Sequence, residues 1–206
     1  MKVMRLTKSL IVSSFAIGFA TMAIPAVAQQ ATTPTVSITP VPSAKMSAND
    51  VLRQAELKAR KEHKAVFLLF HASWCIWCHR IDDMLSDPTL KPIFDKNFVV
   101  IHIDGMEAKK KANLENPGWA PMLDKYHGTG QGIPYWLFLS PKGKVLADCN
   151  SPYDPDKNGK PSNMGFPDKS QPKDLNFFIH DLQKAGAKLS KKDIAAIKSY
   201  LHGLTY

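Results

Sequence analysis

Apolar residues along the chain form two patterns, continuous runs and helical spacing, and together these patterns predict an α/β protein. Short continuous apolar runs are typical of strands buried on both faces of a sheet, whereas apolar residues three and four positions apart indicate helices. The predicted strands are residues 65–71, 98–103, 135–139 and 144–149. The predicted helices are residues 47–63, 78–85, 89–95 and 120–126, one around 175–182 and a last one from 190 to 204. A strand, a helix and a second strand in this order predict a parallel crossover.

Capping and turn residues delimit these elements. Ser47 and Ser190 each precede an Asp by three positions, which is the spacing of a helix N-terminal cap. Pro141-Lys-Gly143 predicts the turn of a hairpin between the last two strands. Residues 151–173 contain five prolines and are predicted to form a loop.

The first 28 residues have the pattern of a cleavable export signal. Three basic residues precede an apolar core at 10–24, and Ala26-Val-Ala28 is a small-residue cleavage site. The core has 15 residues, fewer than the roughly 20 that cross a bilayer, so we expect no stable membrane span after cleavage. Residues 29–46 are rich in Thr, Pro, Ser and Ala and are predicted to be a disordered linker. Residues 47–206 would then be one domain of a periplasmic or secreted protein.

The positive charge of the chain is moderate and dispersed. The formal net charge of +9 becomes 9 − 3 = +6 when the three basic residues of the signal are removed. The other basic residues lie in several short runs without interleaved aromatic residues. Because such runs are typical of solvated surfaces, no nucleic-acid partner is predicted.

Candidate chemistry centres on Trp74-Cys75-Ile-Trp77-Cys78, directly after the predicted strand at 65–71. A helix N-terminus has unpaired N–H groups and the positive end of the helix dipole, so a thiolate at Cys75 would be stabilised there. Cys78, about one turn further on, would resolve a mixed disulfide formed at Cys75. Cys75 and Cys78 are therefore the candidate catalytic residues and redox-active disulfide, reachable from outside. Trp74 and Trp77 are predicted to form the rim of a substrate groove.

Other chemistries could use the same cysteines. Cys75-x-x-Cys78-His79 is also the attachment sequence for c-type haem, but an aliphatic strand leads into it where a haem needs a pocket of helices. A zinc or copper site would combine both cysteines with His71 or His79, but no second pair of ligands completes a set of four. A purely structural disulfide is the remaining alternative. The redox dithiol is favoured, with no metal ligands and no cofactor.

Three further motifs have simpler interpretations. Residues 154–159 match only the first half of a calcium-binding loop and are explained by turn chemistry. The glycines at 128–132 lack the Lys-Ser/Thr and the helix of a phosphate-binding loop. Cys149 is alone at a strand end, where a cysteine is usually a small buried apolar residue; a dimer-forming or regulatory thiol is the alternative.

The Trp74-Cys75-x-x-Cys78 motif after a buried strand, together with Ile133-Pro134 before a later hairpin, resembles the thioredoxin-like family, and its exported members in particular. The resemblance covers about residues 65–188. It implies an α/β thioredoxin-like fold, a central mixed sheet flanked by helices, here with an extra N-terminal helix and an extra C-terminal helix. It also implies that Pro134 is cis and faces the dithiol, so that the backbone of Ile133 binds an extended substrate.

The same resemblance implies a thiol-disulfide oxidoreductase that acts on disulfide-containing client proteins and takes electrons from a membrane or periplasmic thiol donor. An Ile before the cis proline is typical of reductive members, which favours a reductase. Two positions depart from thioredoxins: Leu69 replaces a buried Asp that moves the proton of the second cysteine, and Ile76-Trp77 replaces Gly-Pro. The missing Asp leaves an alternative open, a thioredoxin-fold binding or chaperone-like module with little or no redox turnover.

Overall fold

A computed structural model describes residues 45–168 and 172–204. The predicted signal peptide, 1–28, and nearly all of the predicted linker, 29–46, lie outside these residues. Within the described part of the chain, no helix has both the length and the apolar character that crossing a membrane requires.

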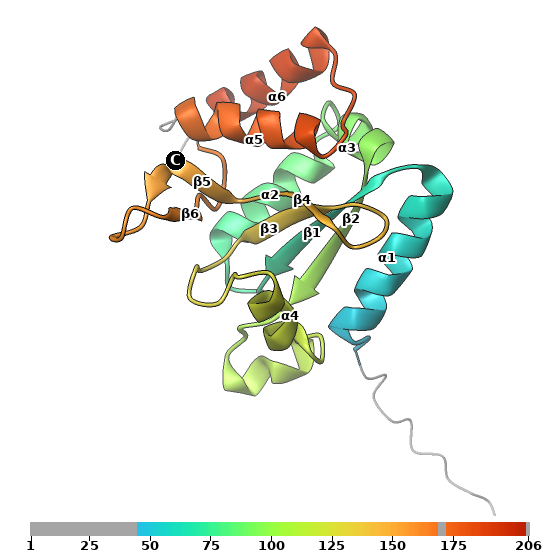
Figure 1. Ribbon diagram of the computed structural model, residues 1–206, viewed down its shortest axis with the longest axis vertical. Coiled ribbons are helices and arrows are strands. Elements are labelled where there is room, and N and C mark those ends of the chain that lie inside the picture. Colours follow the sequence, from blue (N-terminus) through green and yellow to red (C-terminus); the bar gives the residue numbers. More distant parts are fainter. Residues whose placement is uncertain (1–44, 169–171, 205–206) are drawn as a thin grey trace, which may run out of the picture. The chain divides into compact units, whose positions relative to one another are not determined.

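Most of the described chain lies in regular elements (Figure 1). The helices are α1 (Ala48–Glu62), α2 (Ile76–Ser86), α3 (Lys91–Asn97), α4 (Trp119–Lys125), α5 (Pro172–Lys184), α6 (Lys191–Gly203) and the short 3-10 helix η1 (Lys109–Leu114). The strands are β1 (Ala65–His71), β2 (Phe98–Asp104), β3 (Tyr135–Leu139), β4 (Val145–Asp148), β5 (Asn150–Pro155) and β6 (Pro161–Asn163). The order along the chain agrees with the α/β pattern that the sequence predicts.

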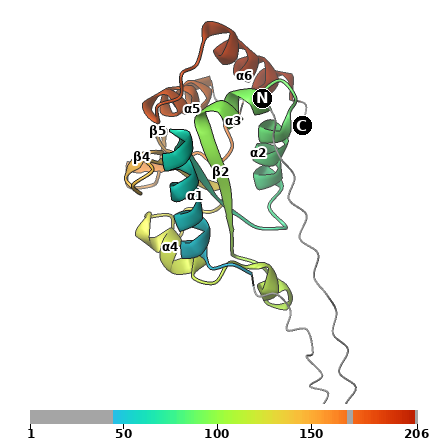
Figure 2. The same cartoon turned by 90° about the vertical axis from the view of Figure 1, so that its right-hand side faces the viewer.

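The central sheet is mixed and has the strand order β2-β1-β3-β4. β1 pairs in parallel with β2, as the crossover predicts, and antiparallel with β3, which pairs antiparallel with β4. Figure 2 shows α1 and α4 on one side of β2 and α2 on the other. Because β1 and β3 are covered on both faces, they are apolar almost throughout rather than alternating. The thioredoxin-like fold class is confirmed, with helices before and after the core.

Phe67, in the middle of β1, is fully buried in the core. Its ring centroid lies 4.5 Å from that of Phe138 and 6.0 Å from that of Phe98, so aromatic side chains from three neighbouring strands pack together. The end of β1 is therefore firmly placed, and the cysteine motif begins immediately after it.

The predicted caps of two helices are present. Ser47 accepts a hydrogen bond from the backbone N–H of Asp50 at the start of α1. At the start of α6, Ser190 and Asp193 form a reciprocal capping box. These caps satisfy N–H groups that the first turn of a helix leaves unpaired.

The prediction of a loop over residues 151–173 is wrong. This segment contains most of an antiparallel hairpin, β5 and β6, and α5 begins at Pro172. The turn of the hairpin is held by Asp156, whose carboxylate accepts hydrogen bonds from the N–H groups of Asn158 and Lys160. Proline removes an N–H donor but is tolerated at strand ends and at irregular pairs, and Pro155 pairs with Pro161 where the register shifts.

Candidate functional site

The cysteine motif lies at the junction of β1 and α2. Cys75 is the N-cap residue of α2, and its Sγ accepts a hydrogen bond from the backbone N–H of Cys78 at 3.1 Å. Cys75 and Cys78 are joined by a disulfide. A sulfur atom in this position contacts the unpaired amides of the first helical turn, which is the environment that stabilises a thiolate when the pair is reduced.

Both sulfur-bearing residues are largely covered. Cys75 is 3% exposed and Cys78 is 2% exposed, whereas Trp74, Ile76 and Trp77 around them are 58%, 66% and 42% exposed. The sequence suggests a dithiol that is open to the outside. The structure instead buries both cysteines beside large exposed apolar side chains.

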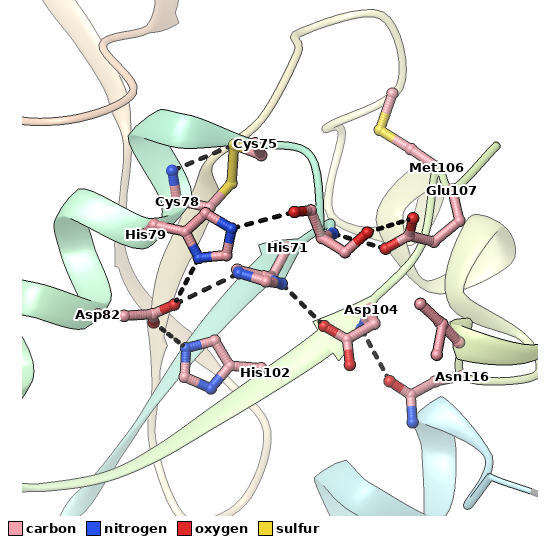
Figure 3. A network of polar contacts seen from close by, with 12 residues as sticks. His71, Cys75, Cys78, His79, Asp82, His102, Asp104, Met106, Glu107 and Asn116 are labelled. Atoms are coloured by element: carbon pink, nitrogen blue, oxygen red, sulfur yellow. Dashed lines mark hydrogen bonds and ion pairs between the residues drawn. A yellow bond between two sulfur atoms is a disulfide. The ribbon is translucent and has the colours of Figure 1, made fainter. Parts of the chain in front are cut away.

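The segment before the disulfide is tied to the loop that follows β2. The backbone N–H and the hydroxyl of Ser73 donate to the two carboxylate oxygens of Glu107, at 2.6 and 2.9 Å. The indole Nε1 of Trp74 donates to the carbonyl oxygen of Met106 at 2.8 Å. These contacts are drawn in part in Figure 3 and fix the chain that leads into Cys75. The Ser73 hydrogen bonds also lower the pKa of the Glu107 carboxyl, because they stabilise its charged form.

A second loop approaches the disulfide from the other side. The Ile133–Pro134 peptide bond is cis, and Ile133 packs against the buried cluster of Ala72, Cys75 and Cys78. The side-chain amide of Asn163, at the end of β6, donates to the carbonyl oxygens of Gly132 and Pro134. The hairpin that the sequence did not predict therefore helps to hold the loop that faces the dithiol.

A groove of about 340 Å³ adjoins this loop. Its lining includes Trp77 of α2, Ile133, Pro134 and Phe166. The rings of Trp77 and Phe166 are stacked, with centroids 6.0 Å apart. Ile133 lines the groove and also packs against the buried cluster of Ala72, Cys75 and Cys78, so this one side chain lies between the groove and the cysteine cluster. Trp74 does not line this groove; its indole is held at Met106.

A polar cluster lies near the disulfide, below it in the view of Figure 3. His71, the last residue of β1, has its Nδ1 at 3.0 Å from a carboxylate oxygen of Asp104 and its Nε2 at 3.3 Å from an oxygen of Asp82. Hydrogen bonding to Asp104 and the nearby carboxylate of Asp82 raise the pKa of His71 to about 9, despite the opposing effect of burial.

Asp82 of α2 is the centre of this cluster. Its two oxygens face three imidazoles, with His102 Nε2 at 2.7 Å, His71 Nε2 at 3.3 Å and His79 Nδ1 at 3.7 Å. Burial acts to raise the pKa of Asp82, but the hydrogen bond with His102 and the nearby imidazole of His71 outweigh it and hold that pKa well below its usual range. Sequence analysis named His71 and His79 but missed Asp82, His102 and Asp104, because the three share no motif and meet only when α2 packs beside β1 and β2.

The third cysteine, Cys149, has a different environment from Cys75 and Cys78. Cys149 follows β4, is fully buried, and its Sγ accepts a hydrogen bond from the backbone N–H of Trp136 at 3.4 Å. Burial raises the pKa of its thiol well above the ordinary value. This is the environment of a small apolar core residue, the interpretation that the sequence favours.

Leu69, where thioredoxins carry a buried Asp, is an ordinary core residue and is 2% exposed. It pairs with His102 on one side and with Trp136 on the other. The interior of β1 therefore offers no carboxylate at this position. The titratable groups of the site lie instead at the end of β1, on α2 and on β2.

Comparison with known proteins agrees with the fold. Residues 48–141 match the model of a family described as thioredoxin-like. No curated protein matches the sequence significantly. Among solved structures, a disulphide isomerase from Xylella fastidiosa is 24% identical, with 53% of this chain and 77% of that chain covered and a TM-score of 0.41. The C-terminal domain of Neisseria meningitidis DsbD in its reduced form is 21% identical, with coverages of 68% and 98% and a TM-score of 0.41.

A thioredoxin from Thermus thermophilus is 17% identical, with 80% of this chain and all of that chain covered and a TM-score of 0.39. These likenesses concern the fold, while the disulfide, its helical amide and the adjoining groove are properties of this chain itself. The arrangement has the two sulfur atoms that thiol-disulfide exchange needs, joined in one disulfide. Residues 48–141 thus match the thioredoxin-like family, and the mixed sheet built on them has a thioredoxin-like fold with a Trp-Cys-x-x-Cys motif.

Proposed function

We propose that this protein is an exported thiol-disulfide oxidoreductase that reduces disulfides in client proteins. The observation that carries the proposal is the position of Cys75: its sulfur caps α2, accepts the N–H of Cys78 and is disulfide-bonded to Cys78. Export rests on the signal pattern of residues 1–28, and the reductive direction rests on Ile133 before the cis proline.

In the first step, the thiolate of reduced Cys75 attacks one sulfur of a client disulfide. A bond forms between Cys75 Sγ and that sulfur, the client's own S–S bond breaks, and the second client sulfur leaves as a thiolate. The amides at the start of α2 stabilise the attacking thiolate, because they donate to negative charge at the N-cap.

In the second step, Cys78 attacks Cys75 Sγ as a thiolate. The Cys75–Cys78 disulfide forms, and the remaining client sulfur leaves as a thiolate, so the client has gained two electrons and this protein has lost two. Leu69 offers no base for the proton of Cys78, so we propose that this proton passes to solvent. A thiol donor in the membrane or the periplasm would then reduce the disulfide again.

The client would bind as an extended segment along the groove lined by Trp77, Ile133 and Pro134. Flat aromatic and aliphatic side chains provide apolar contact without selecting one sequence, which suits a reductase of several clients. The backbone of Ile133 would orient the client disulfide toward Cys75, with which the Ile133 side chain is in contact.

Trapping of mixed disulfides tests the assignment. A Cys78→Ser variant lacks the resolving thiol and should accumulate a covalent complex with a disulfide-containing client, seen by non-reducing electrophoresis and mass spectrometry. A Cys75→Ser variant should trap none, and Cys149→Ala should turn over insulin disulfides like the unchanged protein. Equal trapping by Cys75→Ser and Cys78→Ser would overturn the proposed roles.

A second function, a binding or chaperone-like module, is favoured by one observation: Cys75 is 3% exposed. The module would hold partners through Trp77 and the hairpin and would not depend on the dithiol. If insulin reduction is absent while a Cys75→Ala/Cys78→Ala variant still binds unfolded clients, the module replaces the oxidoreductase.

A further inference from the structure

Three potential metal-ligand atoms converge below the disulfide. They are Nε2 of His71, Nδ1 of His79 and a carboxylate oxygen of Asp82, and all lie within 4.8 Å of one another. His71 Nε2 is 3.3 Å and His79 Nδ1 is 3.7 Å from the same oxygen of Asp82, Oδ2. At metal–ligand bonds of about 2.0–2.1 Å, tetrahedral ligand atoms are separated by about 3.3 Å, so His79 would move toward the other two ligands when a metal binds.

The other nitrogen of each imidazole is already bonded to an acceptor. His71 Nδ1 is 3.0 Å from an oxygen of Asp104, and His79 Nε2 is 3.1 Å from the backbone carbonyl oxygen of Ser73. A carboxylate and a carbonyl accept hydrogen bonds, so these nitrogens carry the ring protons. In the neutral rings, the lone pairs are then on His71 Nε2 and His79 Nδ1, the two atoms that face Asp82.

This orientation is the one that metal-binding histidines have. Their second nitrogen usually donates to a carboxylate or to a backbone carbonyl, which fixes the tautomer and directs the lone pair at the metal. Asp82 is held in the same way, because its other oxygen, Oδ1, contacts His102 Nε2 at 2.7 Å. The outer partners Asp104, Ser73 and His102 thus position all three inner ligands.

One atom of the cluster is left without a hydrogen bond. His71 Nε2 is buried and lies near Asp82 in distance, but not in hydrogen-bond geometry. Without a metal ion, a proton on His71 Nε2 would face Asp82. A divalent cation would take the place of that proton and contact all three atoms at once.

We propose that His71, His79 and Asp82 form a binding site for a divalent cation of the zinc type. Two imidazole nitrogens and one carboxylate oxygen suit Zn²⁺ better than the all-oxygen sites that Mg²⁺ and Ca²⁺ prefer. The fourth position of a tetrahedral site remains for water. The site uses neither cysteine, so it differs from the cysteine-based zinc or copper site that the sequence left as a less favoured alternative.

Isothermal titration of the oxidised full chain with Zn²⁺, after treatment with a chelator, tests the proposal. In the oxidised protein, Cys75 and Cys78 form a disulfide and are not available as thiolate ligands. We expect one zinc ion per chain. Removal of a direct ligand, in His79→Ala or Asp82→Asn, should weaken binding by more than about tenfold. His79 is half exposed, so its replacement leaves the core intact.

His202→Ala, which removes an exposed histidine of α6, is the matched control and should bind zinc like the unchanged protein. Binding that is absent in the oxidised chain, or equally strong in His79→Ala and Asp82→Asn, would overturn the site and leave the cluster as a network of ion pairs. The measurement needs no turnover, so its result is separate from that of the proposed redox function.

Discussion

Cys75 and Cys149 are almost equally buried, at 3% and 0% exposure, yet their surroundings differ completely. Cys75 caps a helix, accepts an amide N–H of the first turn and is bonded to a second sulfur. Cys149 ends a strand in the core, where burial raises the pKa of its thiol and the carboxylates of Asp148 and Asp181 raise it further.

The comparison shows that burial alone does not decide what a cysteine can do. A thiolate needs positive or donating groups, and the N-terminus of α2 supplies them to Cys75. The core around Cys149 supplies negative charge instead, so the neutral thiol is favoured. Ile133, which lines the groove, also packs against the buried cluster that contains Cys75 and Cys78.

Alkylation should separate the two cysteines most strongly. In the reduced, folded protein at neutral pH, we expect iodoacetamide to modify Cys75 on the order of 100-fold faster than Cys149, because the thiolate is the reactive form. Peptide mapping by mass spectrometry of timed samples gives both rates. Unfolding in urea is the control and should make the rates similar. Equal rates in the folded protein would show that the helix N-terminus does not activate Cys75.

The buried carboxyl group of Asp181, near Cys149, predicts how the stability of the protein depends on pH. Asp181 of α5 is 2% exposed, its Oδ2 has no hydrogen-bond partner, and burial raises its pKa from 3.8 to about 6. The charged and titratable groups around it are His180 and Lys184 on α5 and Asp148 on β4, besides the thiol of Cys149.

Because the folded protein holds this proton more tightly than the unfolded chain, Asp181 favours folding at low pH, and that contribution is lost as pH rises from about 4 through about 6. Two pH units correspond to about 3 kcal/mol at most. We expect Asp181→Asn to remove this slope and to be the more stable protein at neutral pH. Urea unfolding at pH values across this range measures the free energy of unfolding of each protein. Asp95→Asn, at an exposed carboxylate, is the control. If the plots of unfolding free energy against pH were parallel for Asp181→Asn and the unchanged protein, the prediction would be contradicted.

The groove should give the smallest effect. Trp77→Ala removes the ring that stacks on Phe166, so we expect the KM for a client to rise by about threefold to tenfold with little change in kcat, since apolar contact is lost while both sulfurs remain. Steady-state reduction of a disulfide-containing peptide measures both constants. Trp74→Ala is the control, because Trp74 does not line the groove. A larger rise in KM for Trp74→Ala than for Trp77→Ala would indicate that the client binds near Met106 instead of in the groove.

Much of the fold could be predicted because the strands are buried on both faces. The runs that form β1 and β3 are apolar throughout, and the predicted bounds, 65–71 and 135–139, agree with the structure. The hairpin of β5 and β6 could not be predicted in this way. Its strands are short and rich in proline and polar residues, so their pairing depends on contacts with the rest of the domain rather than on local pattern.

The candidate site also has one part that the sequence predicts and one part that it does not. The cysteine pair is a local motif, and its place at a helix start follows from the strand before it and the helical spacing after it. The cluster around Asp82 joins residues from β1, α2 and β2, which are separated in the sequence by up to 104 − 71 = 33 positions. Phe166 and Trp77, whose rings stack, are even further apart in the sequence, and no spacing rule connects them.

The sequence by itself determined where the sulfur chemistry lies and that a sheet buried on both faces carries it, because periodicity, caps and short motifs act over a few residues. Only the tertiary structure decided how far the sulfurs are covered, which ring lies opposite Trp77 and that three imidazoles surround one carboxylate. Those features depend on the packing of elements that are distant along the chain, and local pattern contains no information about such distances.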